Sequence, residues 1–290
     1  MMSYSVDILA DSVSNSGARL TTFEAVFPRF ILAEVNTHRM LSRNSASSRA
    51  IPTEKFIASI KEDPFIPKFN ERVVGMGVGE PLIPLLQTEA QAIWQEACEN
   101  ALWSANQLLD LGVDKSRANR LLEPFMWHTA IITATDWENF FALRCPDTDE
   151  VDINFPAQLE FQQLAILMRR ALINSKPRYL EPGQWHIPLV EWDEQCDLGV
   201  ELSKKVAVGR LARRSSYNRK DPESIAKSAQ RHDDLSNSGH WSPFEHVATP
   251  MDNYEWNQYP WSGNFLGWNQ YRKYFPNEWD FSAIRYGEDD

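Results

Sequence analysis

Two stretches of the chain carry the apolar spacing of an amphipathic helix. In residues 85–111 the apolar positions recur every three or four residues, and Gly112 suits the C-terminal stop of a helix. In residues 157–173 one helical face collects Leu164, Leu167, Met168, Ala171 and Leu172. The pattern therefore predicts two long helices, and we expect both of them to pack into the core.

Weaker patterns predict the remaining elements. Residues 23–35 are apolar and indicate a strand that passes into a helix, and residues 247–259 indicate a further strand. Residues 51–84 are rich in Pro, Gly and charge, which is typical of a long loop. Strands and helices do not alternate regularly, so we expect one α+β or mixed α/β domain over residues 1–290, with 51–84 as a loop-rich excursion.

Composition limits the function classes. The 290 residues are 43% hydrophobic, without an apolar run long enough for a membrane helix or the pattern of a signal peptide, so we expect a cytoplasmic protein. Cys98, Cys145 and Cys196 lack metal-ligand spacing, so neither a disulfide framework nor a metal site is predicted. The net charge of -11 disfavours nucleic acid or an anionic membrane as partner. A phosphate site would need a local concentration of arginine.

Such a concentration occurs in residues 36–49, NTHRMLSRNSASSR. Arg39, Arg43 and Arg49 stand there among serine and threonine hydroxyls. Guanidinium groups give paired donors to phosphate, and hydroxyls fill its remaining lone pairs. A solvated helix end with ordinary capping residues would have a similar composition, so composition alone leaves both interpretations open.

This segment resembles the signature of the flavin-dependent thymidylate synthases, which reads RHR, then seven residues, then SxR. The match falls on His38, Arg39, Ser42, Asn44, Ser47 and Arg49. The resemblance implies that the first part of the motif binds FAD through His38, Arg39 and Met40. It implies that the second part binds the nucleotide through Ser45, Ser47, Ser48 and Arg49.

A second block, residues 118–144, resembles the family's NFLxLR-like segment. Arg120 and Pro124 match its start, and Asn139, Phe140, Leu143 and Arg144 match its end. The resemblance implies that Arg120 binds phosphate, that Asn139 contacts the flavin and that Arg144 is catalytic. An arginine beside the pyrimidine would favour the ring form with negative charge on its oxygens. Glu160 and Gln162, in the helix that follows, are expected to be structural.

A third block combines residues 213–217 with HWSPFEH at 240–246. It is similar to the family's (T/S)PFEH block, which implies flavin contacts from Ser216, His240, Ser242 and Glu245. In the family this block comes first, whereas here it comes last, so we predict a circular permutation. Residues 21–30 faintly repeat the SPFEHVATP element. Gln270 and Arg272 are predicted to restore nucleotide contacts, although an aromatic surface helix would explain their segment equally well.

Several ligand positions depart from the family pattern. Thr37 replaces an arginine, Ser45 a glutamate, and Thr133 and Thr135 replace an asparagine and an arginine on the flavin side. Glu34 stands at the position of a nucleotide-contacting glutamine. A carboxylate there could accept a hydrogen bond from a cytosine amino group, so both dUMP and dCMP are candidate substrates, with dUMP preferred.

The resemblance implies a complete activity. Methylenetetrahydrofolate would supply a carbon to dUMP, and NADPH would reduce FAD, giving dTMP. It also implies a mostly antiparallel central sheet flanked by helices, and a homotetramer with shared active sites. Three alternatives remain: a flavin- and folate-dependent deoxypyrimidine hydroxymethylase, a non-catalytic nucleotide-binding protein, and the unrelated cysteine-dependent thymidylate synthase with Cys145 as nucleophile.

Overall fold

The computed structural model describes residues 3–75, 77–217 and 221–279, with the side chains of 216 and 217 outside this description. Its centre is a five-stranded sheet in the order β3-β4-β2-β1-β5. The strands are β1 (Ser5–Ser14), β2 (Arg19–Pro28), β3 (Ser42–Ser45), β4 (Trp127–Ala134) and β5 (Arg178–Leu180). Among these described strands only β5 pairs in parallel, with β1. The fold is therefore α+β with a mostly antiparallel sheet, as predicted.

Strand β2 lies in the middle of the sheet because both of its faces can be buried. Phe23, Ala25 and Phe27 alternate on one face and belong to the largest core cluster. The residues between them include Glu24, which is 1% exposed and bonded to Arg214 on the opposite face. After β2 come the 3₁₀ helix η1 (Arg29–Ile31) and α1 (Leu32–Val35), so the predicted passage from strand to helix is confirmed.

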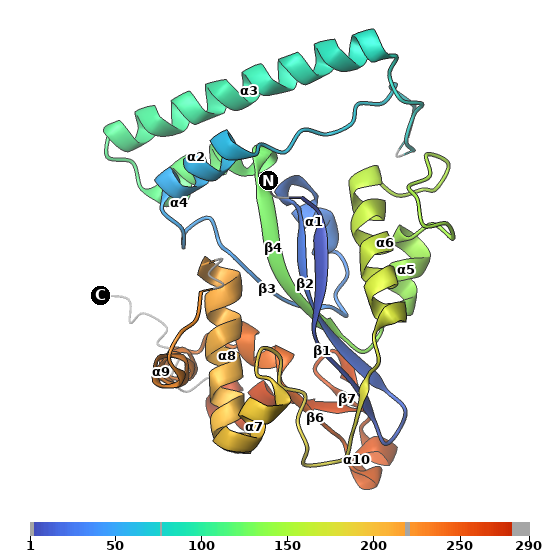
Figure 1. Ribbon diagram of the computed structural model, residues 1–290, viewed down its shortest axis with the longest axis vertical. Coiled ribbons are helices and arrows are strands. Elements are labelled where there is room, and N and C mark those ends of the chain that lie inside the picture. Colours follow the sequence, from blue (N-terminus) through green and yellow to red (C-terminus); the bar gives the residue numbers. More distant parts are fainter. Residues whose placement is uncertain (1–2, 76, 218–220, 280–290) are drawn as a thin grey trace, which may run out of the picture.

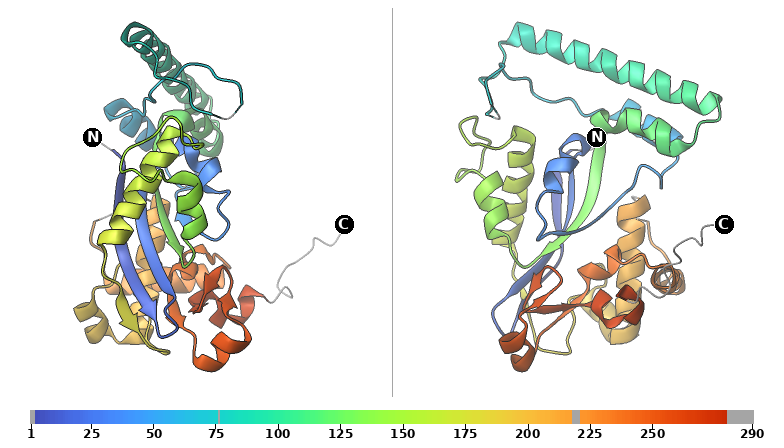
Figure 2. Two further views of the ribbon diagram at one scale, coloured as in Figure 1. Left: turned by 90° about the vertical axis from the view of Figure 1, so that its right-hand side faces the viewer. Right: turned by 180° about the vertical axis from the view of Figure 1, so that it is seen from behind.

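Helices cover both faces of the sheet (Figures 1 and 2). On one face lie α5 (Glu138–Arg144) and α6 (Leu159–Asn174), and Phe140, Phe161 and Leu164 join the core cluster of β2. On the other face lies α8 (Val200–Tyr217), whose Val206, Ala207 and Leu211 pack with Ile131 of β4. The helix predicted at 157–173 is thus confirmed as α6.

The segment expected to be a loop contains a helix, α2 (Thr53–Glu62), which corrects the prediction for residues 51–84. Its Phe56, Ile57 and Ile60 are buried against the next helix, and the flanking prolines hide this short amphipathic pattern in the sequence. The predicted helix at 85–111 is α3 (Pro84–Asp110).

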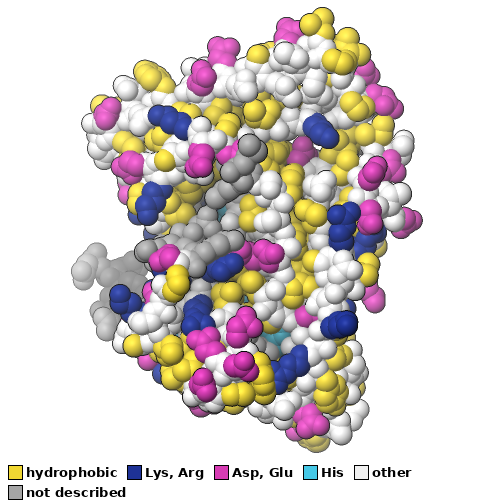
Figure 3. Space-filling model, in the orientation of Figure 1, with side chains coloured by type: hydrophobic (Ala, Val, Ile, Leu, Met, Phe, Trp, Pro, Cys, Tyr) yellow, Lys and Arg dark blue, Asp and Glu magenta, His cyan; other side chains and the backbone are white. Residues whose placement is uncertain are grey.

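Helix α3 is not a core element. It runs along one end of the molecule and buries only Cys98, Leu102 and Ala105, against α2 and the segment of α4 (Lys115–Ala118) and η2 (Asn119–Phe125). Leu85, Ile93 and Trp103 are 75%, 63% and 65% exposed. Figure 3 shows apolar side chains among acidic ones over this end of the molecule. One apolar stripe thus holds the helix, and the rest of its surface faces outward.

The C-terminal part is a set of short elements beside α8. They are α7 (Trp192–Leu198), α9 (Ile225–Asn237), η3 (Ser242–His246), β6 (Ala248–Pro250), α10 (Asn253–Gln258), β7 (Trp261–Ser262), β8 (Phe265–Leu266), β9 (Trp268–Gln270), η4 (Tyr271–Tyr274) and η5 (Pro276–Glu278). The strand predicted at 247–259 is limited to β6, because the Asp252 capping box starts α10. Within the described ranges no helix is long and apolar enough to cross a membrane.

Candidate functional site

The first two sequence blocks meet in one hollow of about 180 Å³, which we term the His38 hollow. It is lined by Thr37, His38, Arg39, Met40, Leu41, Asp136, Asn139, Phe140, Leu143 and Arg144. The turn after α1 supplies the first half of this set, and α5, with Asp136 just before it, supplies the second half. The predicted flavin contacts His38, Arg39, Met40 and Asn139 therefore lie together with the predicted catalytic residue, Arg144.

The side chains of His38 and Arg144 form a pair in this hollow. Arg144 Nε donates to His38 Nε2 at 3.0 Å, and its guanidinium lies 4.7 Å from the centre of the Phe161 ring. Burial, and then the positive charges of Arg144 and Arg43, lower the pKa of His38 to about 4. At neutral pH the imidazole is therefore uncharged and accepts the hydrogen bond, which orients Arg144 without neutralising it.

Local structure fixes both residues. Arg43 Nη1 donates to the carbonyl oxygens of Val35 and His38 at 3.1 and 2.8 Å, which holds the turn that carries His38. Arg144 is in the last turn of α5, where the partial negative charge of the helix end favours a cation. Neither Arg39 nor Arg144 forms an ion pair with any described residue. The hollow thus presents two guanidinium groups with no carboxylate bound to them.

A second and larger hollow, about 760 Å³, lies beyond the other end of β3, and we term it the Arg49 hollow. Its lining is Ser47, Arg49, Ala50, Ala212, Lys227, Gln230, Arg231, Asp234, Leu235, Ser238 and His240. Arg49 is exposed and makes no ion pair within the described part of the chain, whereas Arg231 binds Glu223 at 2.5 and 2.7 Å. With Arg231 bound to Glu223, Arg49 and Lys227 supply the positive charge that makes this hollow suitable for an anion.

Helix α9 supplies the basic side chains that sequence reasoning missed. Lys227, Arg231 and Asp234 follow the i, i+4, i+7 spacing of one helical face, which was the available signal. The helix can approach α8 closely because residue 209 is glycine: a Cβ there would lie 2.0 Å from the carbonyl oxygen of Ser228. His240, just after α9, bonds Ser238 Oγ through Nδ1 at 2.8 Å and lines the same hollow.

The third sequence block adjoins β3 without entering either hollow, apart from His240. Ser242 Oγ donates to Asn44 Oδ1 at 3.2 Å, and Asn44 Nδ2 donates to Ser215 Oγ at 2.5 Å. Glu245 is ion-paired with Arg272. Burial lowers the pKa of Arg43, and the nearby charge of Glu245 opposes this shift. The three blocks thus meet along β3, despite their order in the chain.

The two hollows are separated by the length of β3. Leu41 lines one hollow and Ser47 lines the other, and the six residue steps between them span at most about 20 Å. The predicted flavin contacts His38, Arg39, Met40 and Asn139 therefore line a different hollow from the predicted nucleotide contacts Ser47 and Arg49. His240, predicted as a flavin contact, lies instead with the nucleotide set. A flavin ring bound in one hollow could stack on a nucleobase bound in the other only if one of the two ligands is elongated, or if the two hollows belong to different protomers.

Thr133 and Thr135 are used inside the fold. Thr133 is 0% exposed, and its hydroxyl bonds Thr22 Oγ1 and His246 Nδ1, each at 2.7 Å. Thr135 Oγ1 accepts from Leu266 N at 2.9 Å. These residues occupy positions where the family has flavin-side residues. In this chain they attach the C-terminal segment to β4.

Four predicted nucleotide contacts are engaged elsewhere. Ser48, which is 2% exposed, accepts from Arg29 at 3.0 Å and donates to Glu123, and the exposed Arg120 pairs with Glu123 at 2.9 Å. Gln270 is 2% exposed and donates to Asn264 at 2.8 Å. Arg272 binds Glu245 and Glu278. These contacts hold the local fold, so we do not assign ligands to these four side chains.

Three further predicted positions have separate outcomes. Glu34 Oε2 is buried without a hydrogen-bond partner in the described part, which leaves an acceptor available. Ser45 is half-buried on β3, paired in register with Ala130. Ser216 falls in α8, but its side chain lies outside the described residues.

Cys145 does not have the properties of a nucleophile. It is 5% exposed, and burial is the main cause that raises the pKa of its thiol. A thiolate is disfavoured in these surroundings. The structure therefore gives no support to the cysteine-dependent alternative.

A comparison with known protein families matches the part of the chain that holds the first two sequence blocks. The profile of a family described as thymidylate synthase complementing protein matches residues 19–178, which include the first two blocks but not the third. No curated protein sequence matches.

Two similar solved structures are of a UMP/dUMP methylase, PolB, from Streptomyces cacaoi. The one with 5-Br UMP has 17% identity and a TM-score of 0.48, covering 59% of this chain and 89% of that chain. The one with 5-Br dUMP has 16% identity and a TM-score of 0.44, covering 59% and 90%.

Proposed function

This chain belongs to the thymidylate synthase complementing protein family, and from this premise we propose that it is a flavin-dependent thymidylate synthase. It would convert dUMP to dTMP, with methylenetetrahydrofolate as carbon donor and NADPH as reductant through FAD. One observation carries the proposal beyond family membership. Arg144 is oriented by an uncharged imidazole, and no carboxylate of the described residues binds it or Arg39, which lines the same hollow.

The His38 hollow fits FAD by the chemistry of its donors. The guanidinium groups of Arg39 and Arg144 and the amide of Asn139 suit carbonyl oxygens and phosphate. When bound, FAD would supply the hydride chemistry that these side chains lack. His38, Arg39, Met40 and Asn139 would hold it.

Arg144 is the proposed catalytic residue. A fixed guanidinium beside the pyrimidine stabilises negative charge that develops on the ring oxygens during carbon transfer. The neutral His38 preserves this effect, because an acidic partner would have cancelled the positive charge. The aromatic rings of Phe140 and Phe161 meet the His38 ring edge to face and fix its orientation.

The Arg49 hollow is the proposed place for the nucleotide phosphate. Arg49 and Lys227 supply charge, and Ser47 and His240 supply further polar groups. Ser45 and Glu34 remain proposed base or sugar contacts. The unpartnered Glu34 Oε2 would accept a hydrogen bond from a base N–H, so this carboxylate would decide between uracil and cytosine.

We propose a homotetramer with active sites shared between protomers. The position of the two hollows near opposite ends of β3, with no lining residue in common, supports this arrangement, because one protomer's His38 hollow could then face another protomer's Arg49 hollow. The exposed apolar side chains of α3 provide surface that an assembly would cover. Measurement of molar mass by light scattering tests the oligomeric state.

The deciding experiment combines the purified protein with FAD, NADPH, methylenetetrahydrofolate and either dUMP or dCMP, followed by mass spectrometry of the nucleotide. A methyl gain on dUMP supports the proposal, and reaction of dCMP instead would assign cytosine recognition to Glu34. A hydroxymethyl gain would replace the proposal with the hydroxymethylase. A colourless protein that takes up no FAD and makes no product would indicate a non-catalytic nucleotide-binding protein.

A further inference from the structure

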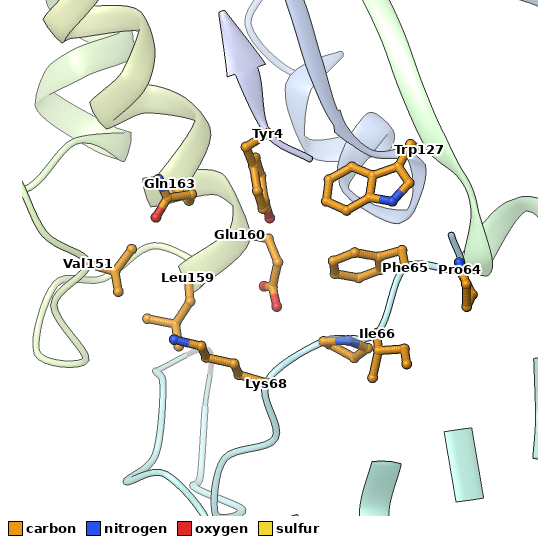
Figure 4. Close-up of a pocket in the computed structure, with 11 residues that line it drawn as sticks. Tyr4, Pro64, Phe65, Ile66, Lys68, Trp127, Val151, Leu159, Glu160 and Gln163 are labelled. Carbon is orange, nitrogen blue, oxygen red and sulfur yellow. The ribbon is translucent and has the colours of Figure 1, made fainter. Parts of the chain in front are cut away.

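A third cavity, of about 310 Å³, shares no residue with the His38 or Arg49 hollow. It lies where residues before β1, the loop 64–68, the first residue of β4 and the start of α6 meet (Figure 4). Its lining is Tyr4, Pro64, Phe65, Ile66, Pro67, Lys68, Trp127, Val151, Leu159, Glu160 and Gln163. It is an apolar cavity with a single carboxylate.

Three aromatic rings form a rigid part of its wall. Trp127 meets the rings of Tyr4 and Phe65 edge to face, with centroids 5.3 and 5.4 Å apart. Phe65 is 4% exposed and also stacks on Phe30 at 5.2 Å. These contacts fix the rings before any ligand binds. A ligand would therefore lose little affinity to ordering of the wall.

Glu160 projects from the first turn of α6 into this cavity, across from Phe65 (Figure 4). No Lys or Arg of the described residues is ion-paired with it. Burial raises the pKa of Glu160, and hydrogen bonds from its own backbone amide and from Gln158 oppose this shift only in part. Burial, followed by the charge of Glu160, also raises the pKa of Tyr4, so the phenol stays neutral. The carboxylate thus lacks a positive partner in apolar surroundings.

We propose that this cavity binds a small organic ammonium ion, paired with Glu160 and with its alkyl groups against the rings of Tyr4, Phe65 and Trp127. A cation near aromatic faces is attracted by their quadrupoles, and the carboxylate adds a direct charge interaction. A neutral apolar ligand would leave Glu160 uncompensated, and an anion would be repelled by it. On this proposal Glu160 would bind a ligand, in addition to the structural role expected from the sequence.

Neighbouring residues separate this role from a structural one. Gln162, two residues later, is 0% exposed and donates to the carbonyl oxygens of Asp152 and Ala157 at 2.9 and 2.7 Å, so it is structural as predicted. The hydrogen bonds of the Glu160 carboxylate, from its own backbone amide and from Gln158, stay at the start of α6 and tie no loop of the described chain. Lys68 lines the cavity but is exposed, and its ammonium group would compete with or repel a bound cation.

The test compares choline with 3,3-dimethylbutan-1-ol, which has the same shape without the charge, by isothermal titration calorimetry on the full chain. We expect choline to bind with a Kd of about 1 mM and the neutral alcohol at least tenfold more weakly. Equal affinity for the two, or no binding of choline at concentrations well above that Kd, would overturn the proposal. This comparison requires no variant and no catalytic turnover, so its outcome is independent of the proposed synthase activity.

Variants then assign the charge. Glu160→Gln keeps the shape and should weaken choline binding at least tenfold, whereas Glu150→Gln removes an exposed charge outside the cavity and should leave it unchanged. Lys68→Gln should tighten binding a few-fold, because it removes a positive charge at the cavity. Unchanged affinity in a Glu160→Gln protein with wild-type Tm would contradict the assignment. If that variant fails to fold, the two-ligand comparison on the unmodified chain still decides.

Discussion

The arginines near β3 fall into two groups that look alike in the sequence. In the first group each guanidinium is bound by carboxylates: Arg214 holds Glu24 of β2, and Arg272 holds Glu245 and Glu278. In the second group Arg49 and Arg144 form no ion pair with any described residue. The arginines of both groups lie in or next to the sequence blocks that resemble the family motifs. Only the second group has a positive charge that no described carboxylate pairs with, and that an anion can therefore use.

The difference concerns what each charge does before a ligand arrives. A guanidinium held by a carboxylate contributes to the fold, and a ligand phosphate would have to displace its partner. An unpaired guanidinium that is held by packing or by a neutral acceptor keeps its full positive charge, which can then attract an anionic ligand. His38 is the clearest case, because it orients Arg144 while leaving the charge intact.

The largest effect should follow from breaking the most buried pair. Arg214→Met removes the guanidinium that binds Glu24, which is 1% exposed, and we expect the loss of this buried ion pair to lower the free energy of unfolding by about 3 kcal/mol. Urea denaturation followed by circular dichroism measures this change. Arg117→Met is the matched control, since Arg117 is exposed, and it should change stability by less than about 0.5 kcal/mol. A similar loss in both variants would contradict the comparison.

Replacing an unpaired arginine should lower activity and leave stability nearly unchanged. Arg144→Ala should lower kcat about 100-fold, equivalent to about 2.7 kcal/mol of transition-state stabilisation, with little change in Tm. Initial rates with dUMP at saturating FAD measure this loss, and a flavin absorbance titration should show that FAD still binds. Arg117→Ala should keep full activity. Unchanged turnover of the Arg144 variant would remove this residue from the mechanism.

The sequence predicted the blocks but not their pairing. Helix α6 and the strand at β2 follow from apolar spacing, which is local information. The contact between Glu24 and Arg214 spans 190 residues, so no local pattern could show that this arginine is already used. For the same reason Thr133 read as a changed flavin contact, although it anchors His246 in the core.

The circular permutation remains a prediction, and two segments with similar sequences and similar contacts are consistent with it. Phe23–Glu24 in β2 and Phe244–Glu245 in η3 each combine a fully buried phenylalanine with a glutamate bound to an arginine. The sequence similarity between them is therefore accompanied by similar contacts. They differ in secondary structure, because Pro243 starts a 3₁₀ helix where Thr22 continues a strand.

A smaller effect should come from the neutral state of His38. Its pKa is about 4 in the folded chain against the ordinary 6.5, so the unfolded chain takes up the proton first as the pH falls. The associated stability is complete above pH 6.5 and is lost as the pH falls toward 4.

We expect His38→Gln, which retains an acceptor for Arg144, to reduce the loss of stability between pH 7 and 4.5 by about 1 kcal/mol. Urea denaturation at both pH values measures it. The buried His128, His186 and His246, with pKa values of about 3, contribute equally to both proteins, so their effect cancels in the difference. If His38→Gln and the wild type lose the same stability between pH 7 and 4.5, burial and the nearby arginines do not lower the pKa of His38.

The smallest effect should come from Glu245→Gln, and it tests whether the paired group takes any part in ligand binding. Both side chains of the Glu245–Arg272 pair are partly exposed, at 19% and 25%, and Arg272 keeps Glu278 as a partner, so stability should change by less than about 1 kcal/mol. If this pair only holds the fold, the Kd for FAD, followed by flavin fluorescence, should stay within about twofold of the wild type. A large loss of FAD affinity at wild-type stability would mean that Glu245 leaves Arg272 to bind the cofactor. The distinction between paired and unpaired arginines would then fail for the third block, because Arg272, which is ion-paired in the unliganded chain, would bind the cofactor.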